Sequence, residues 1–435
     1  MILAHGLGGR SDLPVPLWLA LYGGAIAVLV SFFALTVFWK TPKLSGERSG
    51  RPLPAVLQRL ADGAGLRVLL RACGVLAFAA LLGTAWAGTG SSATNPAPTW
   101  FYVWFWVGLV PLSLLFGPVW RLLNPLRTLA DLLGRGRSRA PLPAWGYRPA
   151  IAGLAAFLWL ELVYDRSDSP RAIAVFVTGY AVLQIAAGVR YGPRWFDRGE
   201  GFEVYAGLIG RLAPIGRRGD GVLVLRNPLD GLAAGSGAGI TPVVLLLLGS
   251  TAFDGLTRLP VWTELTREAS RLPGLLLGTA GLAASVAVIA LAYAGGIRLT
   301  RPYLRRKAGG QPVEPYGAFA HSLIPIMVGY TVAHYFSFAV FQGQAGYLLA
   351  TDPLGLGHDW LGLAGGRIDY TVISVTAIAF VQIIAIVAGH VAGVTSAHDR
   401  AISVLRRDHV TVGQFPMLAV MVGYTAAGIA LVAGA

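Results

Sequence analysis

Residues 272–297 read LPGLLLGTAGLAASVAVIALAYAGGI and contain no charged side chain. An α-helix rises 1.5 Å per residue, so about 20 apolar residues span the hydrocarbon core of a bilayer, which is about 30 Å thick. Similar apolar stretches recur along the chain, separated by short charged segments. This pattern predicts an all-α integral membrane protein.

The composition agrees with a membrane protein. The chain is 55% hydrophobic and 13% charged, with a mean hydropathy of +0.61, whereas a soluble domain has about twice that share of charged residues. A water-soluble fold is therefore excluded at this length. The formal net charge of +14 comes from arginines between apolar stretches, where they face lipid headgroups and orient the chain. Nucleic acid is not an expected partner, because the chain has no basic helix or aromatic RNA-binding motif.

The apolar stretches predict about ten transmembrane helices in a single polytopic domain over residues 1–435. The fourth and fifth are short for a bilayer, and could be tilted neighbours or a half-inserted hairpin. The predicted spans are 15–38, 68–88, 99–120, 149–164, 172–189, 240–256, 272–297, 318–350, 370–394 and 411–434.

The loops alternate in charge, which predicts their sides of the membrane. Cytoplasmic loops retain Lys and Arg, and basic residues are in excess at 39–67, 121–148, 190–237, 298–317 and 395–410. Both termini are therefore predicted to lie outside, with the protein in the plasma membrane. The longest cytoplasmic loop, 190–237, contains an amphipathic run at 204–212 that could lie on the inner leaflet.

Two short motifs recur. Met-Val-Gly-Tyr-Thr occurs at 327–331 and 421–425, and Asn-Pro-Leu occurs at 124–126 and 227–229. Duplication is common in transporter folds, but short matches also arise by chance in membrane sequences of low diversity. Both explanations stay open.

Few ionisable side chains lie within the predicted spans. Each needs a physical reason, because a charge in hydrocarbon costs several kcal/mol. Glu161, Asp254 and His334 are the candidate catalytic residues, at depths of about 18–24 Å from the cytoplasmic ends of their spans. They could share one polar layer, in which a carboxylate orients His334 as a general base, a metal ligand or a proton relay. The alternative is hydrogen bonding between helices without further function.

Four further residues are candidates for substrate binding. Tyr330 and Gln342 share a helix side with His334, and Gln382 lies at a matching depth in the next span. His358, in an outer loop, could line an entrance, although solvation explains it as well. These residues predict a polar pocket that is open to the outside.

The sequence predicts no cofactor firmly. A divalent metal could bind His334 and Asp254. His321 and His390 could bind haem near the cytoplasmic ends of adjacent spans, but haem is not expected, since no second histidine accompanies His334 at its depth. Gly389 and Gly393, four residues apart, instead predict a close contact between helices.

Local enzyme signatures such as Gly-x-Ser-x-Gly and His-Glu-x-x-His are absent from the sequence. Several segments nevertheless resemble a family of actinobacterial polytopic membrane proteins labelled fenitrothion hydrolase, or organophosphate hydrolase-like. The segments are AHGLGGR at 4–10 (with His5), DLPVP at 12–16, STAFDG at 250–255, AHYFS at 333–337, QGQ at 342–344 and AHDRA at 397–401. The resemblance implies phosphotriester hydrolysis by an activated water, commonly metal-bound.

The sequence is compatible with three functions. We expect a multi-pass protein that handles a small, lipophilic molecule through its buried polar layer, as a transporter does. The first alternative is the membrane-bound organophosphate hydrolase that the resemblance implies. The second is a scaffold subunit of a membrane complex, in which the polar layer would face another protein. The lipid bilayer and a small-molecule substrate are the expected partners, and the sequence does not predict a protein partner.

Overall fold

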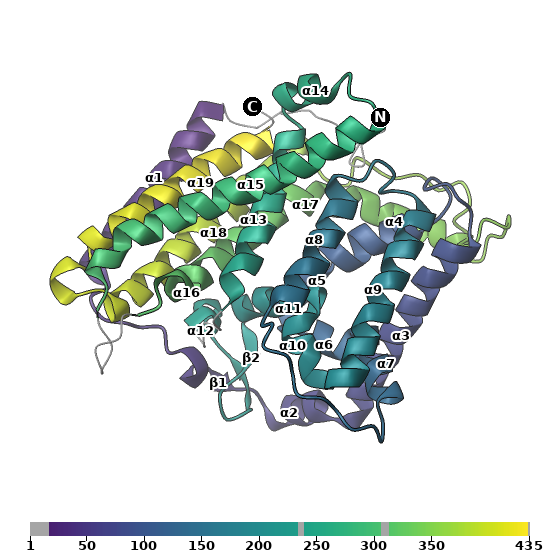
Figure 1. Cartoon of the computed structure of the whole chain (residues 1–435), viewed down its shortest axis with the longest axis horizontal. Helices are drawn as coiled ribbons and strands as arrows, with labels where there is room; N and C mark the ends of the chain where they lie inside the picture. Colours follow the sequence, from purple (N-terminus) through teal and green to yellow (C-terminus); the bar gives the residue numbers. More distant parts are fainter. Residues whose placement is uncertain (1–16, 234–238, 306–312, 434–435) are drawn as a thin grey trace. The chain divides into compact units, whose positions relative to one another are not determined.

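The structure, a computed structural model, describes residues 17–233, 239–305 and 313–433 (Figure 1). His5 and the segments at 4–10 and 12–16 lie outside these residues. The described chain contains nine helical runs that are long and apolar enough to cross a membrane, which confirms a multi-pass α-helical membrane protein. The runs are Trp18–Phe38, Ala64–Ala87, Ala97–Phe116, Pro170–Tyr191, Ile240–Thr257, Arg271–Tyr303, Pro315–Thr351, Val375–Val404 and Val412–Leu431.

Two predicted spans differ from the observed helices. The stretch at 149–164 forms α8 (Arg148–Leu162), whose 15 residues are only about 22 Å long. It is shorter than the nine runs, as the sequence predicted for the fourth span, and its crossing of the membrane stays a prediction. The stretch at 370–394 forms α18 (Val375–Val404), which continues past its predicted end. His398 and Asp399 therefore lie on a helix and not in the cytoplasmic loop where we expected them.

Backbone contacts divide the chain into two compact units, whereas the sequence analysis treated it as one domain. The first unit contains Gly50–Leu225 and Ser337–Val372. The second contains Arg226–Phe336 together with described residues on either side, 17–49 and 373–433. The long helix α17 (Leu323–Leu348) contributes residues to both.

The first unit is built around α3 (Ala64–Ala87) and α9 (Pro170–Tyr191), which pack against each other. The short helix α7 (Pro125–Leu133) packs on α9, and α8 packs on α11 (Gly201–Ile209). Residues Trp100–Val107 form a π-helix between α4 (Ala97–Thr99) and α5 (Leu109–Phe116). The remaining helices of this part of the chain are α2 (Ala55–Asp62), α6 (Trp120–Leu123) and α10 (Phe196–Gly199).

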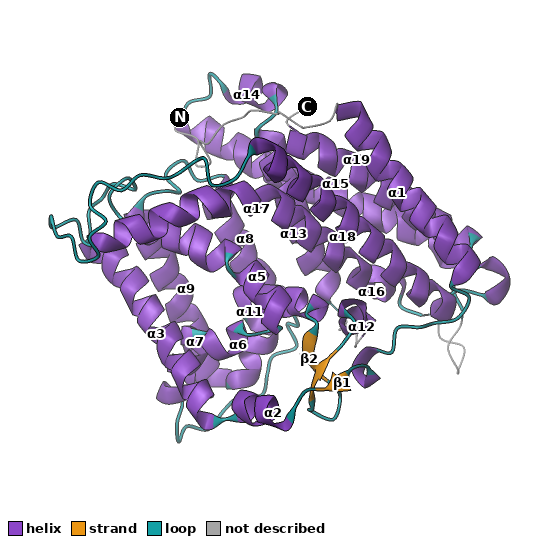
Figure 2. Cartoon of the chain, turned by 180° about the vertical axis from the view of Figure 1, so that it is seen from behind, coloured by secondary structure: helices purple, strands orange, loops and turns teal. Residues whose placement is uncertain are grey.

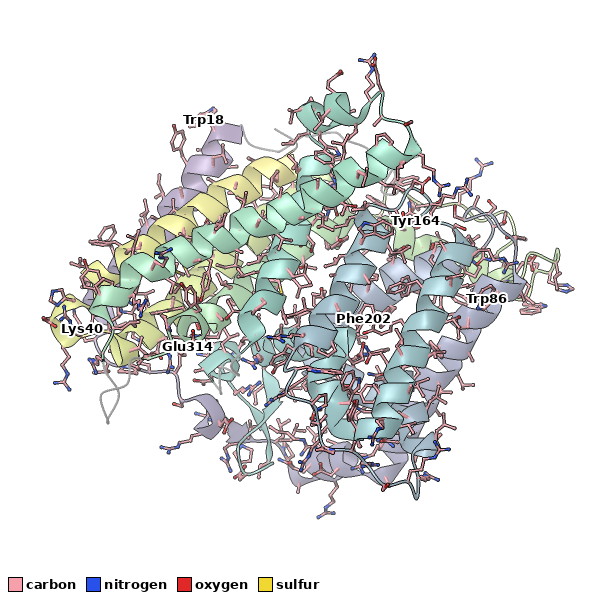
Figure 3. The ribbon with its side chains drawn as sticks, in the orientation of Figure 1. Trp18, Lys40, Trp86, Tyr164, Phe202 and Glu314 are labelled. Atoms are coloured by element: carbon pink, nitrogen blue, oxygen red, sulfur yellow. The ribbon has the colours of Figure 1, made fainter. Side chains whose placement is uncertain are left out.

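Helix α11 corrects our expectation of an amphipathic helix on the inner leaflet. Phe202, labelled in Figure 3, is buried, and so are Tyr205, Ile209 and most of their neighbours on this helix. Except for Glu203, the buried side chains of this helix are apolar or aromatic, and the helix packs against α8 and α5. It is an interior element of the first unit.

A small antiparallel sheet, which the sequence analysis did not predict, also belongs to the first unit (Figure 2). Its strands β1 (Arg51–Pro52), β2 (Ile215–Arg217) and β3 (Leu223–Leu225) have the order β1-β3-β2. Val224 of β3 pairs with both Pro52 and Gly216. Strands of two or three residues are too short to show a period in the sequence.

The second unit contains α1 (Leu17–Phe38), α13 (Ile240–Thr257), α15 (Arg271–Thr300), α18 and α19 (Phe415–Ala433). Trp18 and Lys40 mark the two ends of α1 (Figure 3). Helix α13 packs along α15, α15 packs along α19, and α1 contacts both α18 and α19. The most apolar stretch of α13 is 78% buried, against 11% for α15. Helix α13 is therefore the interior helix of this unit. Shorter helices are α12 (Pro228–Ala233), α14 (Pro260–Thr266) and α16 (Pro315–Phe319).

The predicted close contact at Gly389 and Gly393 is confirmed. A Cβ atom at Gly389 would lie 2.5 Å from the carbonyl oxygen of Pro325, and one at Gly393 would lie 2.7 Å from that of Ser322. Helix α18 therefore approaches the backbone at and before the start of α17 so closely that only glycine fits.

Candidate functional site

Asp254 and His334, two of the residues singled out from the sequence, meet in the second unit. Asp254 lies in the last turn of α13 and His334 near the middle of α17. Oδ2 of Asp254 contacts Nε2 of His334, and the side chains are only 3% and 2% exposed. The structure thus places a carboxylate directly against the imidazole, deep within two apolar helices.

Arg258 is the third member of this cluster, and the sequence analysis missed it. It follows Asp254 by one helical turn, so both side chains lie on the same side of the helix axis. Its Nη2 atom lies 3.0 Å from Nε2 of His334 and 4.0 Å from Oδ1 of Asp254. Its side chain is 43% exposed, so the cluster has one open side.

One ring nitrogen therefore faces two groups. Nε2 of a histidine either carries a hydrogen, which it donates, or has a lone pair, which accepts. With the hydrogen, Nε2 donates to the Asp254 carboxylate, whereas with the lone pair it accepts from the Arg258 guanidinium. It cannot do both, because the guanidinium is only a donor. The tautomer and the protonation state of His334 thus decide which partner its Nε2 atom bonds.

Other polar residues around the cluster are bonded within or between helices. The Tyr330 hydroxyl donates to the carbonyl oxygen of Gly428 on α19 at 3.0 Å. Ser250 and Thr251 both donate to Leu247 on their own helix. These bonds satisfy buried polar groups and hold the helices that carry the cluster.

The remaining candidates are not part of the cluster. Glu161 is buried on α8 of the first unit. Gln342 belongs to the first unit as well, in the later part of α17, and Gln382 is half-buried on α18. His358 is exposed and stacks on Trp360, with ring centroids 5.6 Å apart. Their roles in substrate binding stay predictions.

The donor set of the cluster suits a proton better than a divalent metal. Among the described residues, no group of three or more His, Cys, Asp or Glu side chains could hold a metal ion. Asp254 and His334 supply two donors, but the Arg258 cation approaches the same nitrogen that a metal would need. His390, which was considered as a haem ligand although haem was not expected, has its Nδ1 atom 2.9 Å from the carbonyl oxygen of Ile386, one turn earlier on its own helix.

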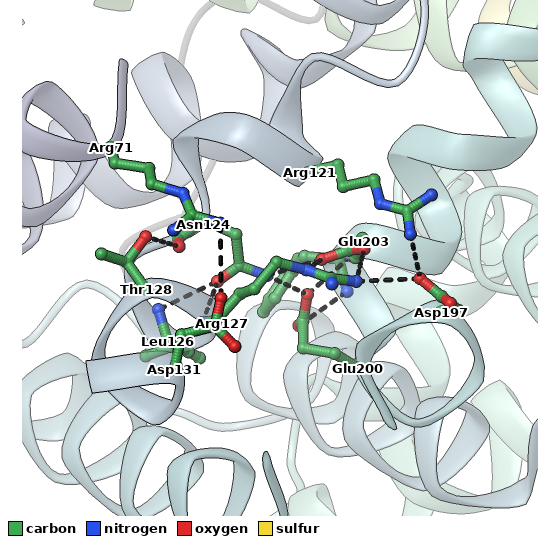
Figure 4. Close-up of polar contacts among 11 residues, drawn as sticks. Arg71, Arg121, Asn124, Leu126, Arg127, Thr128, Asp131, Asp197, Glu200 and Glu203 are labelled. Atoms are coloured by element: carbon green, nitrogen blue, oxygen red, sulfur yellow. Dashed lines mark hydrogen bonds and ion pairs between the residues drawn. The ribbon is translucent and has the colours of Figure 1, made fainter. Parts of the chain in front are cut away.

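A second buried polar cluster lies in the first unit (Figure 4). Arg127, at the start of α7, is held by two carboxylates. Its Nε atom donates to Glu203 Oε2 at 3.0 Å, and its Nη2 atom donates to Asp197 Oδ1 at 2.9 Å and also contacts Glu203 Oε1. Arg127 and Glu203 are each 6% exposed. This ion pair joins α7 to α11 across 76 residues of sequence.

Glu200 lies beside this ion pair and caps α11. Its carboxylate accepts from the backbone amides of Phe202 at 3.0 Å and Glu203 at 2.7 Å, and from the Tyr180 hydroxyl. Asn124 Nδ2 lies 3.2 Å from Glu200 and 3.1 Å from Glu203. Burial raises the pKa of Glu200 to about 7, and the neighbouring Glu203 carboxylate adds to the effect.

The recurring Asn-Pro-Leu motif is the sequence feature that could have indicated this second cluster. Asn124 caps α7 by accepting from the amides of Leu126 and Arg127. Asn227 accepts from the amide of Leu229 at 3.0 Å, at the start of α12. In both copies an asparagine precedes a short helix whose first residue is proline. The residue after the motif differs, because Arg127 in the first unit corresponds to Asp230 in the second.

A third cluster ties the end of α1 to α18 in the second unit. Asp399 Oδ1 accepts from Trp39 Nε1 at 2.9 Å and from the amides of Lys43 and Leu44. The neighbouring His398 has Nε2 at 3.0 Å from the Trp39 carbonyl oxygen and Nδ1 at 3.0 Å from Gln414 Oε1. The segment AHDRA at 397–401 thus has a structural role that is independent of the Asp254–His334–Arg258 cluster.

These features define a multi-pass α-helical membrane protein with a buried carboxylate–imidazole pair and an adjoining guanidinium. No family model, curated protein or solved structure matches the chain. Its function is therefore argued from the cluster alone.

Proposed function

We propose that the protein is a proton-coupled transporter of a small molecule in the plasma membrane, in which Asp254 and His334 carry the proton. The observation behind this proposal is the position of His334 Nε2, which faces the Asp254 carboxylate and the Arg258 guanidinium. A hydrogen gained or lost at Nε2 exchanges the partner of His334. A group with two mutually exclusive partners is what a two-state transport cycle requires.

The surroundings support a functional role for this cluster. Ionisable side chains are expensive within a membrane span and commonly mark proton or substrate pathways. Asp254 and His334 are almost completely enclosed, while Arg258 reaches the surface of its unit. A proton can therefore move between Asp254 and His334, while Arg258 is a fixed positive charge at the open side of the cluster.

Glu161, which is buried on α8 of the first unit, stays a second candidate for a protonatable carboxylate. Tyr330 and Gln382, in the second unit, are the proposed contacts for the transported molecule, whereas the binding roles of Gln342 and His358, in the first unit, stay predictions. Tyr330 is the best placed of these residues, because it precedes His334 by one turn on α17.

The test uses purified protein in liposomes that contain a pH-sensitive dye. Pools of small molecules are added outside under an imposed pH gradient, and proton entry is followed. We expect solute-dependent proton entry for the wild type and almost none for Asp254→Asn or His334→Gln. Glu264→Gln, at an exposed acid that pairs with Arg267 at 3.3 Å, is the control and should behave as wild type. Full activity in Asp254→Asn would refute the proposed proton site.

The hydrolase is a second candidate, because a carboxylate that orients an imidazole is also the arrangement of a general base. Purified protein would then release nitrophenol from a nitrophenyl phosphotriester, and His334→Gln would abolish the release. Metal and haem content, from elemental analysis and visible absorbance, should be measured beside it. A stoichiometric metal that is lost in His334→Gln would favour the hydrolase over the transporter.

A further inference from the structure

Arg258 has donors that the cluster does not use. A guanidinium has five N–H groups in a planar fork, and Nη2 of Arg258 points at His334. The side chain is 43% exposed and sits 4.0 Å from the nearest Asp254 oxygen, which is too far for a direct hydrogen bond. The guanidinium therefore reaches the open side of the cluster while its carboxylate neighbour is engaged with His334.

The charge of the cluster depends on the proton. With a neutral His334, the Arg258 cation and the Asp254 anion balance. One added proton leaves the cluster with a single positive charge. An uncompensated charge is costly in a low-dielectric site, so the protonated cluster favours a ligand of charge minus one. With a hydrogen on Nε2, His334 bonds Asp254 and leaves the guanidinium of Arg258 free for a ligand.

We infer that the site binds its small molecule as an anion, through a carboxylate or a phosphate group, together with one proton, and that Arg258 is the residue that binds the anion. This inference rests on the proposed transport function and adds the substrate class to it. The planar fork matches two oxygens of a carboxylate or phosphate at once. An apolar body on the ligand would suit the apolar residues of α13 and α17.

The test compares three ligands that share one ring: benzoate, benzamide and benzylammonium. Full-length protein in nanodiscs is titrated with each by calorimetry, in two buffers of different ionisation enthalpy. We expect only benzoate to bind, with uptake of about one proton per anion. Its affinity should fall by at least about tenfold between pH 6 and pH 8, because proton and anion binding are linked.

Variants test whether Arg258, and not another basic residue, binds the anion. Arg258→Gln should weaken benzoate binding by at least about tenfold, and Arg258→Lys should lose less, because it keeps the charge but not the fork. Arg267→Gln is the matched control, since Arg267 is exposed and pairs with Glu264 at 3.3 Å. The thermal midpoint of each variant without ligand shows whether the variant is folded. If Arg258→Gln is not folded, Arg258→Lys is compared with the wild type instead.

Several results would overturn the inference. They are unchanged benzoate binding in Arg258→Gln, equal binding of benzamide, binding without proton uptake, or no binding of benzoate. Proton-driven uptake of a neutral or cationic solute could also be found to require His334 but not Arg258. That result would refute the anionic substrate and support the proposed transport function. Benzoate binding that depends on Arg258, without any transport, would support the anion site and refute the proposed transport function.

Discussion

The Nη2 atom of Arg258 lies 3.0 Å from Nε2 of His334, the same atom that contacts the Asp254 carboxylate. This relationship turns a buried acid–histidine pair into a cluster with two alternative bonding states. It also links the enclosed end of the cluster to its exposed end, because Arg258 alone of the three is substantially exposed.

The Asp254–His334 contact should stabilise the fold as well as serve function. Removing one partner of a buried charged pair typically costs about 3–5 kcal/mol, because the other partner is left unpaired. We expect Asp254→Asn and His334→Gln to be non-additive, with a coupling of about 2 kcal/mol in the free energy of unfolding in mixed micelles. The exposed pair Glu264 and Arg267 should give a coupling below about 1 kcal/mol in the same assay. Additive effects at Asp254 and His334 would show that the contact is not maintained.

Gly389 should not tolerate a side chain. A Cβ atom there would lie 2.5 Å from the Pro325 carbonyl oxygen, so Gly389→Ala must push α18 and α17 apart, at a cost of about 1–3 kcal/mol. Gly423 in the recurring Met-Val-Gly-Tyr-Thr motif has nothing within 4 Å of its Cβ position. Gly423→Ala should therefore be neutral or slightly stabilising. Thermal unfolding in detergent compares the two variants, and equal midpoints would contradict the close contact.

Glu200 should make stability depend on pH. Its pKa in the folded protein is about 7, compared with 4.5 for an ordinary glutamate. The folded state thus binds this proton more tightly than the unfolded state does. The stabilisation is complete below about pH 4.5 and is lost as the pH rises through about 7, and it amounts to about 3 kcal/mol.

Glu200→Gln tests this dependence, because glutamine resembles the protonated acid. The thermal midpoint of the wild type should fall relative to that of the variant between about pH 5 and pH 8. Glu264→Gln, at an exposed position, should keep a constant offset from the wild type over this range. Parallel profiles for Glu200→Gln would show that Glu200 is already ionised at the lower pH.

The predicted orientation can be tested at His358. The only cysteine in the sequence is Cys73, so Cys73→Ser gives a background without thiols. His358→Cys in that background should react in intact cells with a thiol reagent that cannot cross the membrane, because its loop is predicted to lie outside. A cysteine in place of Arg137, in a loop predicted to be cytoplasmic, should react only after lysis. The reverse pattern would invert the topology.

The sequence alone determined the fold class and most of the spans. Hydrophobic length is a local property, since a helix must match the bilayer whatever it packs against. For the same reason Asp254 and His334 stood out, as ionisable residues within apolar stretches, and the spacing of Gly389 and Gly393 indicated a close contact. The short α8 was visible as a weak span, but its final length was not.

Only the tertiary structure decided which polar groups meet. Arg258 lies just past the predicted span 240–256 and was not singled out from the sequence, and the fold turned it towards His334, 76 residues away. Arg127 and Glu203 likewise lie 76 residues apart, and α11 proved to be interior, where an amphipathic surface helix was expected. Partners that are distant in sequence are chosen by the packing of whole helices, which no local pattern encodes. Composition therefore determined that the chain crosses a membrane, and packing determined the site.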